Sequence, residues 1–156
     1  MSEQRPGFHL AVPVNDIQQA RAFYGGVLGL TEGRSADNWV DWNFYGHQFV
    51  THEVTVPRGA DERWLGAAPT SYAADAGHSS VDGHRVPVPH FGLLLSIVDF
   101  HALADRLRAA GVEFVIEPYL RFAGQPGEQW TMFLRDPSGN AMEFKAFRDE
   151  SQVFAV

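Results

Sequence analysis

Two histidines, each near the start of a similar stretch of chain, have the side chains best suited to chemistry. His9 stands in Phe-His-Leu-Ala-Val-Pro-Val and His90 in Pro-His-Phe-Gly-Leu. In both stretches the residue two positions on is small, Ala11 or Gly92, so a strand leaves open space beside each imidazole on the same face. The opposite faces carry large apolar side chains typical of a core. Each histidine is therefore on the face where a metal ion can approach.

A carboxylate interrupts an apolar stretch near the end of the chain. Glu143 lies in Asn-Ala-Met-Glu-Phe-Lys, in phase with Ala141. Burying a carboxylate is costly unless it is paired or bound to metal. Two imidazoles and one carboxylate form a facial triad that suits Fe(II) oxygen chemistry, or Zn, Mn or Ni acting as a Lewis acid. We predict one divalent metal ion bound by His9, His90 and Glu143; the alternative is that these side chains pack in the core or face solvent.

Two further side chains are candidate acid–base groups. His52 lies on an expected strand and Tyr119 near a loop, where either could exchange a proton with a bound substrate. The alternatives are an exposed strand residue and an ordinary packing tyrosine. The absence of cysteine excludes disulfides, thiolate zinc sites and cysteine nucleophiles. Phosphate-loop, serine-elbow and dinucleotide-binding glycine motifs are also absent from the sequence, which argues against nucleotide-driven chemistry and serine hydrolysis.

The elements that must position these residues occur twice in the same order. Apolar periodicity predicts a strand, a helix and three strands at about 8–14, 17–27, 28–34, 39–45 and 47–56. It predicts a second set at about 89–98, 100–110, 112–118, 128–135 and 140–147. Asn15 or Asp16 is expected to cap the first helix and Asp99 the second. The order β-α-β-β-β, found twice, indicates an internal duplication.

The expected organisation is a single domain covering residues 1–156. Module one spans 8–56, a long loop 57–89, module two 89–147 and a tail 148–156. The loop is either a surface connector or a lid over a pocket, with Trp64 and Tyr72 as its heavy side chains.

Composition and charge exclude several classes of function. The chain has 156 residues, 45% of them hydrophobic and 20% charged, which is typical of a globular domain. Its net charge of −7 is unfavourable for binding nucleic acid or an anionic membrane surface. The polar N-terminus does not resemble a signal peptide, and no apolar run is long enough to span a bilayer. These features favour a cytoplasmic protein whose partner is a small-molecule substrate.

Three segments of the chain resemble the vicinal oxygen chelate superfamily, which includes glyoxalase I, extradiol dioxygenases and bleomycin-resistance proteins. They are residues 8–30, residues 89–93 and residues 133–145; the last contains Asp-Pro-x-Gly-Asn-x-x-Glu, the most specific of these motifs. The resemblance implies an α+β fold in which two tandem βαβββ modules form a cleft-like open barrel. It also implies one metal centre in the cleft, with His9, His90 and Glu143 at the family's ligand positions, and a homodimer.

The resemblance leaves three activities open. Glyoxalase I takes a fourth ligand from the last strand of its first module, and aligning Gly46 with Gly139 places Val50 opposite Glu143. Valine cannot coordinate a metal, although Gln48 could substitute after a change of register. The three-ligand pattern favours a dioxygenase or a fosfomycin-type thiol transferase over glyoxalase I. The thiol transferase needs a basic cleft, which this acidic chain does not suggest, so the preferred expectation is an extradiol-dioxygenase-like enzyme acting on a substrate with vicinal oxygens. The alternatives are a glyoxalase-like lyase or isomerase, and a metal-free small-molecule binding protein of the bleomycin-resistance type.

Overall fold

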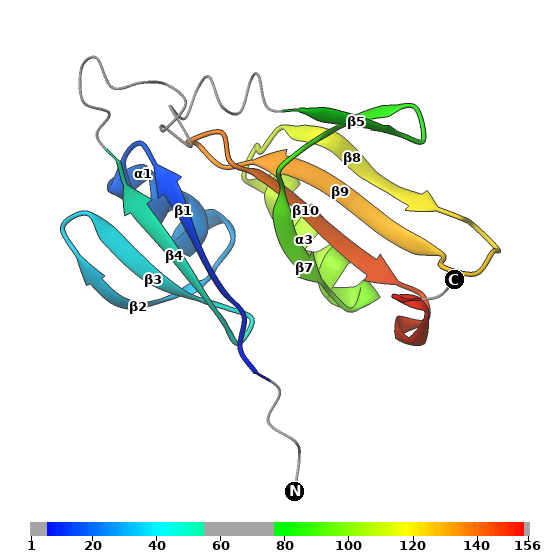
Figure 1. Ribbon diagram of the computed structural model, residues 1–156, viewed down its shortest axis with the longest axis horizontal. Helices are drawn as coiled ribbons and strands as arrows, with labels where there is room; N and C mark the ends of the chain where they lie inside the picture. The colour runs from blue at the N-terminus through cyan, green and yellow to red at the C-terminus, as the bar shows by residue number, and fades with distance from the viewer. Residues whose placement is uncertain (1–5, 55–76, 155–156) are drawn as a thin grey trace, which may run out of the picture.

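The computed structural model describes residues 6–54 and 77–154, which form a mixed α+β fold of two modules. Each module contributes a four-stranded sheet, in the orders β1-β4-β3-β2 and β7-β10-β9-β8 (Figure 1). The predicted α+β class with two βαβββ modules is confirmed. Within the described ranges the two sheets are separate and do not form a closed barrel. No helix in these ranges has the length and apolar character needed to cross a membrane.

The first module follows the predicted order of elements. It consists of β1 (His9–Val14), α1 (Ile17–Ala20), a π-helix (Arg21–Val27), β2 (Thr31–Ala36), β3 (Trp39–Phe44) and β4 (His47–Glu53). Asp16 caps α1 by accepting hydrogen bonds from the Gln18 and Gln19 amides. The helix predicted at 17–27 widens into a π-helix from Arg21 onward. Gly25 in this helix lies against the Trp42 ring, and a Cβ added to Gly25 would come within 3.3 Å of that ring.

The second module repeats this order with one difference at its helix. Its elements are β7 (Phe91–Leu94), α3 (Ile97–Ala109), β8 (Phe114–Arg121), β9 (Gln129–Arg135) and β10 (Ala141–Phe147), followed by a 3-10 turn (Glu150–Gln152). The cap of α3 is Ser96, not Asp99 as predicted. The Ser96 hydroxyl accepts a hydrogen bond from the Asp99 amide and donates one to the Asp99 carboxylate. The helix therefore begins three residues earlier than expected.

Part of the segment predicted as a long loop forms a β-hairpin. Strands β5 (His78–Val81) and β6 (His84–Pro87) are joined by Asp82 and Gly83, both with positive φ angles. An Asp-Gly pair favours such a two-residue turn. The hairpin lies over β8 and β9 (Figure 1), where Val86 packs with Ile116 and Phe133. Trp64 and Tyr72, proposed as the heavy side chains of a lid, lie outside the described residues.

The two modules share one hydrophobic core. The helices lie behind both sheets in the view of Figure 1, and buried residues from both modules form one cluster. The rings of Phe49 on β4 and Phe91 on β7 lie 5.2 Å apart at their centroids. In β1, Val12 and Val14 are buried on the core face, whereas His9 is exposed on the other face, as predicted. The faces that carry the candidate ligands therefore point away from the shared core.

Candidate metal centre

His90 and Glu143 form the centre of the candidate site. His90 immediately precedes β7 and Glu143 lies on the neighbouring strand β10, and the two side chains meet with Nε2 and Oε2 3.0 Å apart. They line a cavity of about 250 Å³ that Phe91, Leu94 and Lys145 also border. Glu143 is buried, with 9% of its surface exposed. The polar pair at the start of β7 thus opens onto a cavity large enough for a small ligand.

Three neighbours stabilise the charge on Glu143. The Thr131 hydroxyl donates a hydrogen bond of 2.7 Å to Oε1, and the Lys145 ammonium lies 3.4 Å from the same oxygen. Burial raises the pKa of the Glu143 carboxyl, but the hydrogen bonds from His90 and Thr131 and the charge of Lys145 outweigh it, so the pKa lies below its ordinary value. Glu143 is therefore an anion at neutral pH, and its Oε2 faces His90.

The His90 ring is oriented by a backbone carbonyl. Its Nδ1 lies 2.7 Å from the Pro87 oxygen, which can only accept, so Nδ1 carries a proton and Nε2 points at Glu143. The Phe133 ring packs edge-on against the imidazole at 5.1 Å. The hydrogen bond with Glu143 raises the pKa of His90. A neutral Nε2 and a carboxylate oxygen are both electron-pair donors, so a proton or a metal cation must lie between them.

These features fit a divalent metal ion. Imidazole nitrogen and carboxylate oxygen are ligands for Fe, Zn, Mn and Ni. A metal-binding histidine usually donates its other ring proton to a carbonyl or carboxylate, as His90 does to Pro87. Gly92 is also required at this place, because an added Cβ would clash with the Glu143 carbonyl oxygen. The sequence suggested that Gly92 leaves open space beside His90, but in the structure the missing side chain instead lets the β7 and β10 backbones approach closely.

His9 does not join this pair within the chain. It lies on the exposed face of β1, where its Nδ1 is 2.8 Å from Oε1 of Gln48. In Figure 1 the chain enters β1 from below and β7 from above. The first residues of these two neighbouring strands therefore lie at opposite ends of the strands in this view. Among residues 6–54 and 77–154, no three His, Asp or Glu side chains are close enough to hold one metal ion. The structure therefore brings together two of the three predicted ligands.

Strand register supports the predicted equivalence of Val50 and Glu143. Ala11 pairs with Val50 in the parallel pair β1–β4, and Gly92 pairs with Glu143 in the parallel pair β7–β10. Since Ala11 and Gly92 each follow a candidate histidine by two residues, the two pairs correspond. Module one therefore has a valine where module two has its carboxylate.

The two candidate acid–base residues lie apart from His90 and Glu143. His52 pairs with Pro13 across β1–β4 and is exposed on the face that carries His9. Tyr119 on β8 pairs with Thr131, and its hydroxyl donates a 3.2 Å hydrogen bond to Asp82 in the hairpin turn. Burial raises the pKa of Tyr119. Thr131 pairs with Tyr119 on β8, and its hydroxyl donates a hydrogen bond to Glu143 on β10.

Sequence reasoning did not identify Thr131 or the Pro87 carbonyl as parts of the site. Thr131 stands opposite Tyr119 on β8 and donates to Glu143 on β10, so alternation along β9 could have placed it on the ligand face. The Pro87 carbonyl leaves no such signal, because every residue type supplies a backbone carbonyl.

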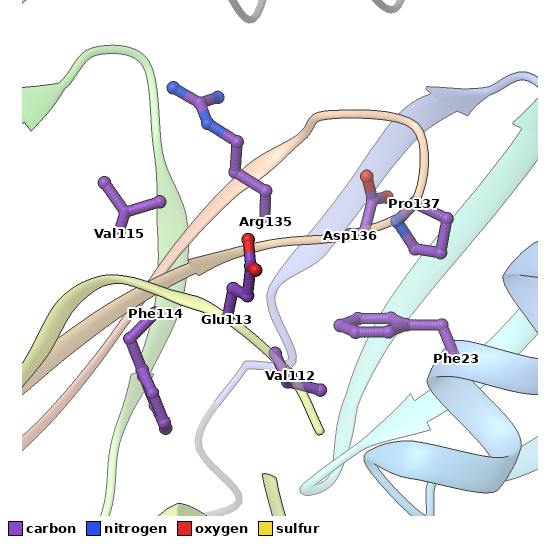
Figure 2. Close-up of a pocket in the computed structure, with 8 residues that line it drawn as sticks. All are labelled: Phe23, Val112, Glu113, Phe114, Val115, Arg135, Asp136 and Pro137. Atoms are coloured by element: carbon purple, nitrogen blue, oxygen red, sulfur yellow. The ribbon is translucent and has the colours of Figure 1, made fainter. Parts of the chain in front are cut away.

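A larger cavity, of about 450 Å³, lies where the two modules meet. Figure 2 shows Phe23 and Pro137 on one side of it and Val112 and Glu113 on the other. Asp136, which also lines it, accepts hydrogen bonds from Tyr24 and Ser138, and the cavity has no histidine among its lining residues in the described part of the chain. Its walls therefore lack the paired nitrogen and oxygen donors found at His90 and Glu143, and we place the candidate site at that pair.

Comparisons with known proteins agree with this architecture. The family model described as the Glyoxalase/Bleomycin resistance protein/Dioxygenase superfamily matches residues 8–144. A solved glyoxalase/bleomycin resistance protein/dioxygenase from Alicyclobacillus acidocaldarius is similar, with 28% identity, a TM-score of 0.70 and coverage of 99% of this chain and 100% of that one. The fosfomycin resistance protein FosX from Listeria monocytogenes shares the fold at 14% identity and a TM-score of 0.60, covering 92% and 94%. A search of curated proteins found no significant match.

Proposed function

Because the chain belongs to the Glyoxalase/Bleomycin resistance protein/Dioxygenase superfamily, we propose that it is a divalent-metal-dependent enzyme acting on a small substrate with two neighbouring oxygens. The observation that carries the proposal is the 3.0 Å pair formed by His90 and Glu143. The Pro87 carbonyl holds the His90 tautomer that a metal requires. The metal is Fe, Zn, Mn or Ni, and its third protein ligand is His9.

We propose a homodimer in which His9 of a second copy completes each site. His9 is exposed and lies apart from His90 and Glu143 in its own chain. β1 and β7 are each an edge strand, and in Figure 1 they lie on the sides of the two sheets that face each other. The ligand faces of both sheets point away from the shared core. Two copies related by a two-fold axis can therefore bring His9 of each to the His90–Glu143 pair of the other.

Among reactions of this superfamily, the donor set favours an extradiol-dioxygenase-like activity. Val50 stands at the position matching Glu143 and cannot supply a fourth ligand. Three protein ligands leave more coordination positions open for a bidentate substrate and a further small ligand than four do. A glyoxalase-like lyase or isomerase is the alternative, and an assay of both reactions separates them.

When bound, the metal ion acts as a Lewis acid toward the two substrate oxygens. Glu143 and His90 hold their donor atoms toward the cavity, and Thr131 keeps Oε1 of Glu143 engaged so that Oε2 is available. Lys145 borders the cavity with a positive charge, which stabilises negative charge on the substrate oxygens. Leu94 and Phe91 supply apolar walls that exclude water from one side. We assign proton transfer to His52, which shares the sheet face of His9 and would enter the shared site with it, or to Tyr119, whose strand partner Thr131 binds Glu143.

The first test is the metal content of the purified protein. About one equivalent of Fe, Zn, Mn or Ni per chain is expected by elemental analysis, and the His90→Ala variant should lose it. Protein that stays free of metal after anaerobic reconstitution with each ion, yet binds aromatic ligands tightly, would instead support a binding protein without turnover.

A mixed-dimer experiment tests the shared site. The variants His9→Ala and His90→Ala each break every site of a homodimer. A heterodimer of the two chains, isolated through two different tags, regains one intact site only if His9 acts across the interface. One metal ion per heterodimer is the expected result. No recovery of metal binding in a heterodimer of confirmed composition would contradict the shared site.

Activity is tested by reconstituting the protein with Fe(II) in the absence of oxygen. A panel of catechols is then assayed for oxygen-dependent ring cleavage, beside an assay with a glutathione hemithioacetal. Ring cleavage by the wild-type protein that is lost in Glu143→Ala supports an extradiol-dioxygenase-like activity. Turnover of the hemithioacetal alone would favour the lyase or isomerase alternative.

A further inference from the structure

We propose that Gln48 is a positioning residue that holds His9 in the tautomer with its proton on Nδ1 and its lone pair on Nε2. The consequence for metal binding rests on the proposed function, but the tautomer itself can be measured without metal. The sequence offered Gln48 as a possible fourth metal ligand, whereas the structure places its amide oxygen against the His9 ring.

The two side chains are direct neighbours on one sheet face. His9 pairs with Gln48 in the parallel pair β1–β4, and both side chains are exposed. Oε1 of Gln48 lies 2.8 Å from Nδ1 of His9. An amide oxygen has no proton to donate, so the hydrogen bond requires the proton to be on Nδ1 of His9. The neutral ring then has its free lone pair on Nε2.

The same arrangement occurs at His90 with a different acceptor. There the Pro87 carbonyl oxygen lies 2.7 Å from Nδ1, and Nε2 points at Glu143. Both candidate ligands thus have Nδ1 engaged by an amide-type oxygen. In module two the oxygen comes from the backbone, and in module one it comes from a side chain. This correspondence indicates that Nε2 is the metal-binding atom of both histidines.

Register and chemistry both argue against Gln48 as a ligand. Its equivalent in module two is Ala141, because Val50 corresponds to Glu143 and the two positions are two residues apart. Its amide oxygen faces Nδ1 of His9 and accepts the proton there, and its amide nitrogen has no lone pair to offer. Gln48 therefore acts on a metal through His9.

The effect on metal binding should be measurable because His9 is exposed. An exposed imidazole without a partner rotates freely and must be ordered when it binds. Removal of such an orienting partner commonly lowers metal affinity by about 10- to 100-fold. Loss of the Gln48 amide should have an effect of this size, with no loss of fold, since the side chain is outside the core.

The decisive test is NMR of the imidazole ¹⁵N nuclei in metal-free protein at a pH where His9 is neutral. The His9 signals are assigned by their loss in a His9→Asn variant. Wild type is expected to show the proton on Nδ1, whereas Gln48→Ala should shift toward the Nε2-protonated form that free histidine favours in water. Gln48→Glu keeps an acceptor and should restore the wild-type pattern. A wild-type proton on Nε2, or no change in Gln48→Ala, would overturn the proposal.

The second readout is a titration with Zn²⁺ and Co²⁺. Gln48→Ala should bind each ion about 10- to 100-fold more weakly than wild type. The matched control is Gln19→Ala, which removes another exposed glutamine, on α1, and should leave the affinity unchanged. Equal affinities for wild type and Gln48→Ala would refute the positioning role. A wild-type protein that binds neither ion would instead refute the proposed metal centre, and the tautomer measurement would still decide the role of Gln48.

Discussion

The hydroxyl of Tyr24 donates a 2.7 Å hydrogen bond to the Asp136 carboxylate, joining the helix of module one to the β9–β10 turn of module two. Asp136 is buried and also accepts from the Ser138 amide and from the backbone and side chain of Asn140. The Asn140 side chain in turn donates to the Pro13 carbonyl on β1. Burial raises the pKa of Asp136 even though these hydrogen bonds favour its charged form. The turn motif therefore holds the two modules together.

Tyr24→Phe tests this connection. The substitution keeps the ring, which packs 4.9 Å from Phe49, and removes only the hydroxyl. Since hydrogen bonds to charged groups contribute about 1.5–3 kcal/mol, we expect a loss of about 2 kcal/mol in the free energy of unfolding, measured with urea. Tyr45→Phe, which removes an exposed hydroxyl, should change stability by less than about 0.5 kcal/mol. Equal stabilities for the two variants would show that the connection contributes little.

The same tyrosine predicts a stability change at alkaline pH. Burial and the neighbouring Asp136 raise the pKa of Tyr24 well above its ordinary value of 10.0. An unfolded tyrosine ionises near pH 10 while the folded one stays protonated, so its contribution is complete below pH 10 and is lost as pH rises through the folded pKa. The stability difference between wild type and Tyr24→Phe should therefore narrow above pH 10. A difference that stays constant to the highest pH at which both proteins fold would contradict this.

Gly92→Ala should disrupt the strand pair that carries the candidate site. An added Cβ would clash with the Glu143 carbonyl oxygen, so β7 and β10 must separate. We expect a loss of at least about 3 kcal/mol in unfolding free energy, in the range of severe backbone substitutions, together with loss of metal binding. Gly26→Ala is the control, because no atom lies within 4 Å of its added Cβ. Wild-type melting of Gly92→Ala would show that the strands can adjust.

Much of the fold follows from local sequence signals. Alternation in Leu10, Val12 and Val14 identifies the core face of β1 and places His9 on the other face, as observed. Alternation does not identify strands as short as those of the β5–β6 hairpin. The β5–β6 hairpin escaped prediction because its strands have four residues each and alternate little, although Asp82 and Gly83 favour a turn.

The relative placement of the modules is not predictable from periodicity. Alternation shows that His9 and Glu143 lie on the non-core faces of their sheets, but not whether those faces meet. That depends on contacts such as Phe49 with Phe91, which put the two core faces in one cluster. The orientation of His90 was equally hidden, since its partner is a backbone oxygen. Sequence reasoning thus identified candidate residues, and tertiary packing decided which of them meet.

Thr131→Val separates the support of Glu143 from general stability. Thr131 is buried, and its hydroxyl donates to Oε1 of Glu143 at 2.7 Å. Valine has nearly the same shape but cannot donate a hydrogen bond, so the Glu143 carboxylate gains freedom to rotate. We therefore expect about tenfold weaker Zn²⁺ binding.

Thr51→Val is the matched control, because Thr51 is equally buried and accepts its hydrogen bond from Trp42 in module one. Both variants should lose about 1–2 kcal/mol of unfolding free energy, but only Thr131→Val should weaken Zn²⁺ binding. Equal Zn²⁺ affinities in the two variants would mean that Glu143 does not depend on Thr131 for its orientation.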